Sequence, residues 1–226
     1  MKVLKTILAL FISFTVTAQA VQDITYFDIP TDQVGEFIQT HKKFMDVTMN
    51  DERKVQGQWV YRHFYGSGAS VAVFTDFANI NDAVNDDPWA SLRSKWQSSN
   101  EDERKELEAL GQKYASFLVN HSDDIRSSNF ENNFVGKENV DWDTPFILVV
   151  GNYNVNKPNA SIAGNAFMEW RTKPGVEKGL QLGGGYTTHF SGSGPDLQLF
   201  SGFKNIVDFA KSVSTEDVSN SEASSA

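Results

Sequence analysis

The 226-residue sequence contains no cysteine, and this absence excludes disulfides, a lipid-modified N-terminal cysteine and thiolate catalysis. The core must therefore be stabilised by packing and hydrogen bonds alone. Histidine is also scarce, at four residues, and the sequence contains no zinc motif, EF-hand loop or acid pair suited to glycosidase chemistry. We therefore expect neither a metal site nor a bound cofactor.

Basic residues are in the minority, because 20 lysines and arginines stand against 29 acidic residues and give a formal net charge of -9. Nucleic acid and anionic membrane surfaces are poor partners for such a chain. The simplest interpretation of the acidity is a well-solvated surface. We therefore expect no nucleic-acid partner. The composition is compatible with a small-molecule ligand, and the sequence identifies no protein partner.

Long hydrophobic runs are absent apart from one near the N-terminus, at residues 7–16. This run is well short of the ~20 residues that a membrane-spanning helix needs. It follows two lysines and precedes Ala18-Gln19-Ala20, the small-x-small pattern of a signal-peptidase site. Residues 1–20 are therefore predicted to be a cleavable export signal of a secreted or periplasmic protein, without stable membrane insertion after cleavage. A single N-terminal anchor is the competing interpretation.

One sequence pattern occurs at two distant places, residues 63–84 and 189–210. Both windows begin with His-Phe-x-Gly-Ser-Gly and contain Asn-Ile-x-Asp, and roughly 10 of their 22 positions are identical without a gap. The offset of about 126 residues is far longer than the period of a solenoid or propeller. The pattern therefore predicts two copies of one domain-sized unit.

Each copy predicts the element order strand, helix, strand, strand, helix, which begins a ferredoxin-like βαββαβ unit. Period-2 and helical apolar patterns place the strands of the first copy at 24–29, 58–65 and 69–77, and its helices at 31–48 and from Asn79 onward. The corresponding strands of the second copy are expected at 146–155, 185–191 and 197–203, and its helices at 161–172 and 205–213. A long charged stretch, 87–124, is predicted to be helical, with a capping signal at Asn100 and Glu103 or at Ser99 and Asp102, and a short strand is expected near 128–134.

These patterns divide the chain into five segments. They are the signal at 1–20, a first ferredoxin-like unit with an inserted long helix at 21–135, a linker at 136–145, a second ferredoxin-like unit at 146–213, and a tail at 214–226. The tail is rich in serine and acidic residues and is predicted to be disordered. The second unit is therefore expected to lack its last strand.

With paired βαββα units and the repeated His-Phe-x-Gly-Ser-Gly hairpin, the chain resembles the dimeric α/β-barrel superfamily, in particular its uncharacterised secreted bacterial members. The resemblance implies an α+β fold in which two tandem ferredoxin-like units pack sheet to sheet as a pseudo-dimeric α/β barrel. Members of that superfamily include cofactor-free monooxygenases, haem-degrading enzymes and proteins without known activity. The resemblance therefore favours no single chemistry.

The candidate ligand-binding residues are Trp59, Tyr61, His63 and His189. The first three share one face of the strand 58–65, and the two aromatic rings are of the kind that stacks on flat ligands. His63 and His189 occupy equivalent places in the two copies, but two histidines alone make a poor metal site. The alternative is that the aromatic rings fill space left by smaller residues of the second copy, and that the histidines are structural groups beside glycine turns.

Three functions remain open at this point, and no residue is assigned a catalytic role. The favoured one is a non-catalytic small-ligand-binding or accessory protein with a cavity between its sheets. The second is a cofactor-independent monooxygenase-like enzyme acting on a planar aromatic substrate. The third is a structural or assembly protein, which would expose an apolar patch instead of a cavity.

Overall fold

The computed structural model describes residues 19–129 and 133–214 of the chain. The predicted export signal up to residue 18 and the predicted tail beyond Ser214 lie outside the described residues. Within the described part, no helix is both long enough and apolar enough to cross a membrane.

The first half of the chain contributes four antiparallel strands. They are β1 (Val21–Phe27), β2 (Val55–Arg62), β3 (Val71–Phe77) and β4 (His121–Ser127), and their spatial order is β2-β3-β1-β4. Strands β1 and β3 are rich in β-branched and aromatic residues, which suits their buried position inside the sheet. The connections between the four strands follow the βαββαβ order of a ferredoxin-like unit.

Helices cover the outer face of these strands. They are α1 (Val34–Thr48), the short α2 (Ile80–Val84), α3 (Pro88–Ser98) and α4 (Glu101–Phe117). Their apolar sides meet the sheet in one core that includes Phe27, Phe37, Phe44, Val71, Val73, Leu107, Tyr114 and Phe117. The rings of Phe44 and Tyr114 stack there at 4.1 Å between centroids, which joins α1 to α4.

The second half contributes β6 (Ile147–Tyr153), β7 (Gly183–Gly192) and β8 (Leu197–Phe203), in the spatial order β7-β8-β6, and the short β5 (Phe134–Gly136) also pairs with β7. Its helical layer consists of α6 (Lys157–Phe167), the π-helical turn η2 (Met168–Thr172), α7 (Lys173–Glu177) and α8 (Ile206–Ser214). Within the described residues, no strand follows α8 and none pairs with the outer edge of β6.

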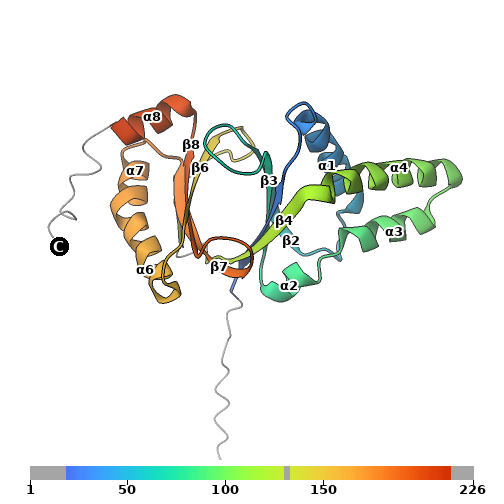
Figure 1. The fold of residues 1–226 in the computed structure, drawn as a ribbon, viewed down its shortest axis with the longest axis horizontal. Helices are drawn as coiled ribbons and strands as arrows, with labels where there is room; N and C mark the ends of the chain where they lie inside the picture. The colour runs from blue at the N-terminus through green and yellow to red at the C-terminus, as the bar shows by residue number, and fades with distance from the viewer. Residues whose placement is uncertain (1–18, 130–132, 215–226) are drawn as a thin grey trace, which may run out of the picture.

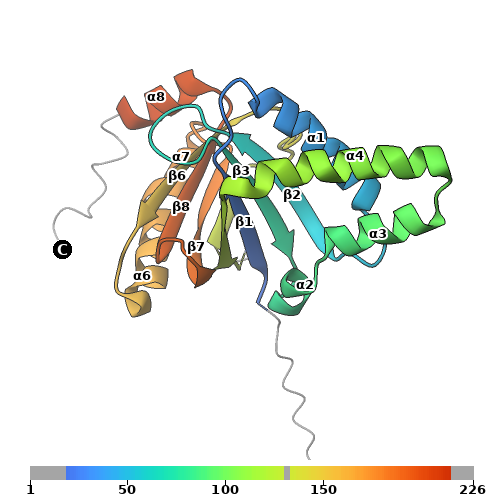
Figure 2. The same ribbon diagram turned by 45° about the vertical axis from the view of Figure 1, so that its right-hand side comes forward.

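A single curled antiparallel sheet joins the two halves, because β4 pairs with β7 in the register that places Ser127 opposite Thr188. Strands β2 and β6 are the two ends of this sheet among the described residues. One group of helices, including α1, α3 and α4, lies on one outer side, and α6, α7 and α8 lie on the other (Figures 1 and 2). The chain therefore has an α+β fold with a half-barrel whose concave face is turned away from both helical layers.

The long charged stretch differs from its prediction as one helix over 87–124. Asp87 and Asn100 each cap a separate helix, and the capping box of Asn100 with Glu103 is confirmed. The second helix ends at Phe117 and packs on α1, so it belongs to the helical layer of the first half.

The strand β4 was not predicted, because the sequence His-Ser-Asp-Asp-Ile-Arg-Ser has no apolar alternation. The structure buries its charges instead: Asp124 and Arg126 are both 0% exposed, and Arg126 Nη1 donates to Asp124 Oδ2 at 2.6 Å. The strand expected near 128–134 meets the described β5 only at Phe134, and residues 130–132 of that prediction lie outside the described residues.

Candidate functional site

A cavity of about 290 Å³ lies on the concave side of the sheet. Side chains alternate along each strand, so the residues that do not face the helical cores line this space. Most of them are aromatic, and they come from both halves of the chain: Gln22, Trp59, Tyr61, Phe74, Asp76, Phe134, Trp142, Phe146, Leu148, Gly183, Phe200 and Gly202. The cavity is therefore shared between the halves, and its volume is near the lower end of the range of about 300–1,000 Å³ for small-molecule sites.

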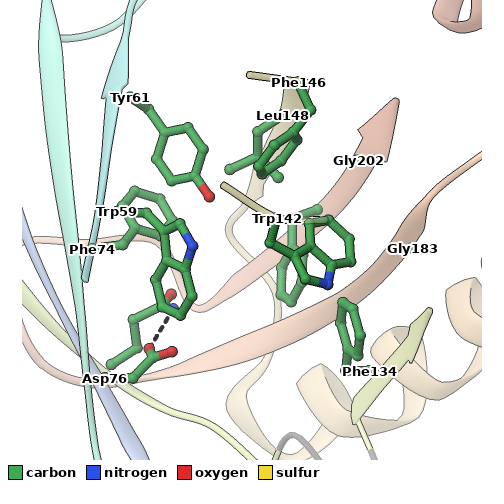
Figure 3. A pocket seen from close by; sticks show the side chains of 12 residues that line it. Trp59, Tyr61, Phe74, Asp76, Phe134, Trp142, Phe146, Leu148, Gly183 and Gly202 are labelled. Atoms are coloured by element: carbon green, nitrogen blue, oxygen red, sulfur yellow. Dashed lines mark hydrogen bonds between the residues drawn. The ribbon is translucent and has the colours of Figure 1, made fainter. Parts of the chain in front are cut away.

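Aromatic rings form two opposite walls of the cavity, with Asp76 at its base (Figure 3). On the first wall, the ring of Tyr61 meets that of Phe74 edge to face at 5.1 Å between centroids. On the second wall, Trp142 meets Phe146 at 5.3 Å. The two walls touch where Tyr61 approaches Phe146 at 5.9 Å, so side chains connect the two ends of the sheet.

Trp59 reaches the cavity because β2 alternates and because the residue two positions earlier is a glycine. A Cβ atom on Gly57 would lie 2.6 Å from Trp59 Cη2, far inside van der Waals contact. The indole therefore folds over the bare backbone of Gly57. Directly opposite Trp59 in the hairpin register is Phe74 of β3, whose ring lines the same cavity.

Asp76 is the carboxyl group of the cavity, and Gln22 on the neighbouring strand supports it. The register places the two residues opposite each other, and Gln22 Nε2 donates to Asp76 Oδ1 at 2.8 Å. Burial raises the pKa of Asp76 to about 6, and the hydrogen bond from Gln22 opposes part of this shift. The cavity thus contains an acid that changes protonation state close to neutral pH, a property often found at functional sites.

Tyr61 brings a hydroxyl group into the same space (Figure 3). Burial raises the pKa of Tyr61, and the negative charge of Asp76 raises it further. The phenol therefore stays protonated at neutral pH and is available as a hydrogen-bond donor. A flat ligand between the walls would meet aromatic faces on both sides and polar groups at Asp76 and Tyr61.

The structure brings two of the four predicted ligand-binding residues, Trp59 and Tyr61, into the cavity. His63 lies beyond the end of β2 with an exposed side chain and does not line the cavity. His189 lies at β7, where its Nε2 is 3.2 Å from the carbonyl oxygen of Gly192 and 3.8 Å from Asp124 Oδ1. The two histidines are therefore not brought together with the aromatic residues around this cavity.

The sequence analysis missed Asp76, Gln22 and the second aromatic wall. The sequence repeat could have indicated two of the lining residues, because Phe74 and Phe200 are equivalent positions of the repeated pattern and both line the cavity. Trp142 was assigned to the linker, where no strand alternation predicts its direction. Residues 19–129 and 133–214 contain no group of three or more histidine and acidic residues arranged to hold a metal ion.

Comparison with known proteins supports the fold. Neither a protein-family model nor a curated protein matches this sequence. A candidate monooxygenase from Fusobacterium nucleatum is similar in structure, with a TM-score of 0.56 and 12% identity over 90% of this chain and 84% of that chain. A candidate monooxygenase from Lactobacillus acidophilus has a TM-score of 0.50 and 11% identity over 89% of this chain and 84% of that one.

An anthrone oxidase-like protein is also similar, with a TM-score of 0.56 and 9% identity over 91% of this chain and 81% of that one. At these identities the likeness concerns the fold alone. What this chain shares with these proteins is its fold, an α+β architecture with a curled antiparallel sheet.

Proposed function

We propose that this protein is a monooxygenase-like enzyme that acts on a planar aromatic substrate held in the cavity. The observation that carries the proposal is the pair of aromatic walls around about 290 Å³, with Asp76 and Tyr61 as converging polar groups. The names of the three structural neighbours support the same class of reaction. The non-catalytic function favoured by the sequence receives no such support.

The reaction needs no reductant from outside when the substrate itself supplies the electrons. A ring methylene flanked by aromatic rings, as in anthrone, loses its two C–H bonds and becomes a carbonyl group. One atom of O₂ enters that carbonyl, and the other leaves as water with both hydrogens, so the four electrons of the substrate reduce one O₂. The task of the protein is to hold the ring in a dry, defined position near O₂, which the aromatic walls suit.

Oxygen uptake with anthrone tests the proposal. We expect uptake and quinone formation above the rate without protein, and we expect Trp59→Ala to lower that increment by about tenfold or more because it removes one wall of the cavity. Ile162→Ala is the matched control, since Ile162 is an exposed apolar residue of α6. If Trp59→Ala and the unaltered protein increase the rate of oxygen uptake equally, the reaction does not take place in this cavity.

We propose further that the two halves are copies of one ferredoxin-like unit. Val21 pairs with Phe77 and Ile147 pairs with Phe203, so both pairs keep the offset of 126 residues seen in the sequence repeat. An experimental structure in which these strands fail to superpose in that register would contradict the duplication.

Export of the chain is also a proposal. The evidence is the two-lysine start, the short apolar run and the Ala-Gln-Ala pattern at 18–20. N-terminal sequencing of the protein from its native host should give Val21 as the first residue. Recovery of the intact N-terminus in the cytoplasm would contradict this assignment.

A further inference from the structure

The charges around the cavity are unbalanced. Asp76 is the one lining side chain that carries a full charge at neutral pH among the described residues, since no lysine, arginine or histidine belongs to the lining. Arg126 lies opposite Gln22 on β4, but its guanidinium group is already bound to Asp124 and Thr187. A ligand in the cavity therefore meets a negative charge that no protein cation neutralises.

One oxygen of the Asp76 carboxylate is left for a ligand. Oδ1 accepts the hydrogen bond from Gln22, and Oδ2 has no hydrogen-bond partner in the described part of the chain. Figure 3 shows this carboxylate at the base of the cavity, beside the ring of Trp59 and across from Phe134. An ionised carboxylate in such surroundings is stabilised by a donor that also carries positive charge.

The aromatic walls have the same preference. The face of an aromatic ring is the negative side of its quadrupole, and a cation near the face of tryptophan, tyrosine or phenylalanine is attracted to it. Trp59 and Trp142 stand on opposite walls, so an ammonium group near Asp76 would lie within an aromatic enclosure. This attraction offsets part of the cost of removing the cation from water. The formal net charge of -9 favours the approach of cations as well.

We propose that the cavity selects a planar aromatic substrate that carries a protonated amine, and that Asp76 is the residue that recognises this ammonium group. The inference builds on the proposed function for the identity of the site, but it concerns binding and not turnover. An aromatic carboxylate is rejected, because it would bring a second negative charge beside Asp76 into an apolar enclosure. A neutral alcohol of the same shape binds with intermediate affinity, since it offers a hydrogen bond without a charge.

Calorimetric titration with three probes of one shape tests this selection. The probes are 2-naphthylmethylammonium, 2-naphthylmethanol and 2-naphthoate, at pH 8, where Asp76 is ionised because burial raises its pKa only to about 6. We expect the ammonium probe to bind about tenfold or more tightly than the alcohol, and the carboxylate to bind more weakly than both. Equal affinities for the ammonium probe and the alcohol would overturn the proposal.

Asp76→Asn removes the charge and keeps the shape of the side chain. In this variant the ammonium probe should bind no more tightly than the alcohol, and a cooperative urea unfolding transition shows that the variant is still folded. Asp32→Asn is the matched control, because it changes the net charge equally at an exposed position outside the cavity, and it should retain the preference. A preference that persists in Asp76→Asn would also overturn the proposal.

The two proposals fail in different ways. If the ammonium probe is preferred but no protein-dependent oxygen uptake occurs with anthrone or with an amine-bearing analogue of it, the recognition of the cation stands and the oxygenase assignment fails. If oxygen uptake occurs and the three probes bind alike, the oxygenase assignment stands and the role of Asp76 fails.

Discussion

At the scale of single residues, the ionised side chain of Asp76 lowers the stability of the folded protein, because it is partly removed from water. Its pKa is raised to about 6 from 3.8 because burial disfavours the charged form. Between these pH values the folded protein holds the proton more tightly than the unfolded chain does. Stability therefore falls as the pH rises from about 4 to about 6.

Asp76→Asn removes this cost, so its free energy of unfolding should exceed that of the unaltered protein by about 3 kcal/mol at pH 8. Below pH 4 the two proteins should be equally stable, because Asp76 is then protonated in both states. Urea unfolding at the two pH values measures the difference. A variant that is less stable than the unaltered protein at pH 8 would show that the carboxylate stabilises the fold.

Gly57 determines the position of Trp59. Gly57→Ala would place a methyl group 2.6 Å from the present position of Trp59 Cη2, so the indole must move. We expect a loss of about 1–3 kcal/mol in the free energy of unfolding and severalfold weaker binding of 2-naphthylmethylammonium. Gly35→Ala is the control, because nothing lies within 4 Å of its added Cβ in α1, and it should stabilise by about 0.5–1 kcal/mol. Similar effects of the two substitutions would contradict the account of Trp59.

At the scale of elements, His41 connects two helices to the sheet. The ring lies within hydrogen-bond distance of the Tyr114 hydroxyl on α4, at 3.1 Å, and of Gln58 Oε1 on β2, at 2.9 Å. Burial lowers the pKa of His41, so the folded protein favours the neutral form of the ring. The contribution of His41 to stability is therefore complete above its ordinary pKa of 6.5 and is lost as the pH falls toward the lowered value.

His41→Gln should remove this pH dependence, and the stability difference between it and the unaltered protein should shrink from pH 8 to pH 5. Ile162→Ala removes an exposed side chain that does not titrate, so it should show a constant difference over the same range. Urea unfolding at several pH values measures both. A difference for His41→Gln that does not change with pH would contradict the neutral, buried histidine.

The buried pair of Asp124 and Arg126 anchors β4 to β7. Arg126 also donates to the hydroxyl and the carbonyl group of Thr187, so its removal breaks these bonds and leaves the buried Asp124 without its 2.6 Å hydrogen-bond donor. We expect Arg126→Met to lower the free energy of unfolding by about 3–5 kcal/mol. Lys42→Met, which removes the exposed ion pair with Asp46, should cost less than about 1 kcal/mol in the same thermal or urea measurement. Equal losses of stability in the two variants would show that the buried pair does not stabilise the contact between β4 and β7.

The strands that the sequence analysis found and the one it missed differ in how they use polar residues. Strands β3 and β8 alternate apolar residues against a helical core, which is the signal that sequence patterns detect. Strand β4 instead carries the buried pair of Asp124 and Arg126, and the Arg126 guanidinium group also bonds to Thr187 of β7, a partner that no local pattern reveals. Asp76 lies inside the predicted strand 69–77, but no local pattern shows that its side chain lines a cavity shared with the other half of the chain.

At the scale of the whole molecule, the repeated hairpin predicts two related halves, and this duplication stays a proposal. The curled sheet carries one group of helices on each outer side (Figure 1). The repeat could not predict the cavity, because Trp142 belongs to the predicted linker and both Trp142 and Phe146 lie outside the two repeated windows. The shape of the cavity depends on how the halves meet, through the pairing of β4 with β7, and this pairing is not encoded in either copy alone.

The central claim is that this cavity oxygenates a planar aromatic ring. The most direct measurement is mass spectrometry of anthrone incubated with the protein under ¹⁸O₂, compared with Trp59→Ala and with anthrone alone. We predict a quinone product with one ¹⁸O atom, formed faster than without protein and at a strongly reduced rate by Trp59→Ala. Product formation no faster than in the absence of protein, or equally fast with Trp59→Ala, would contradict it.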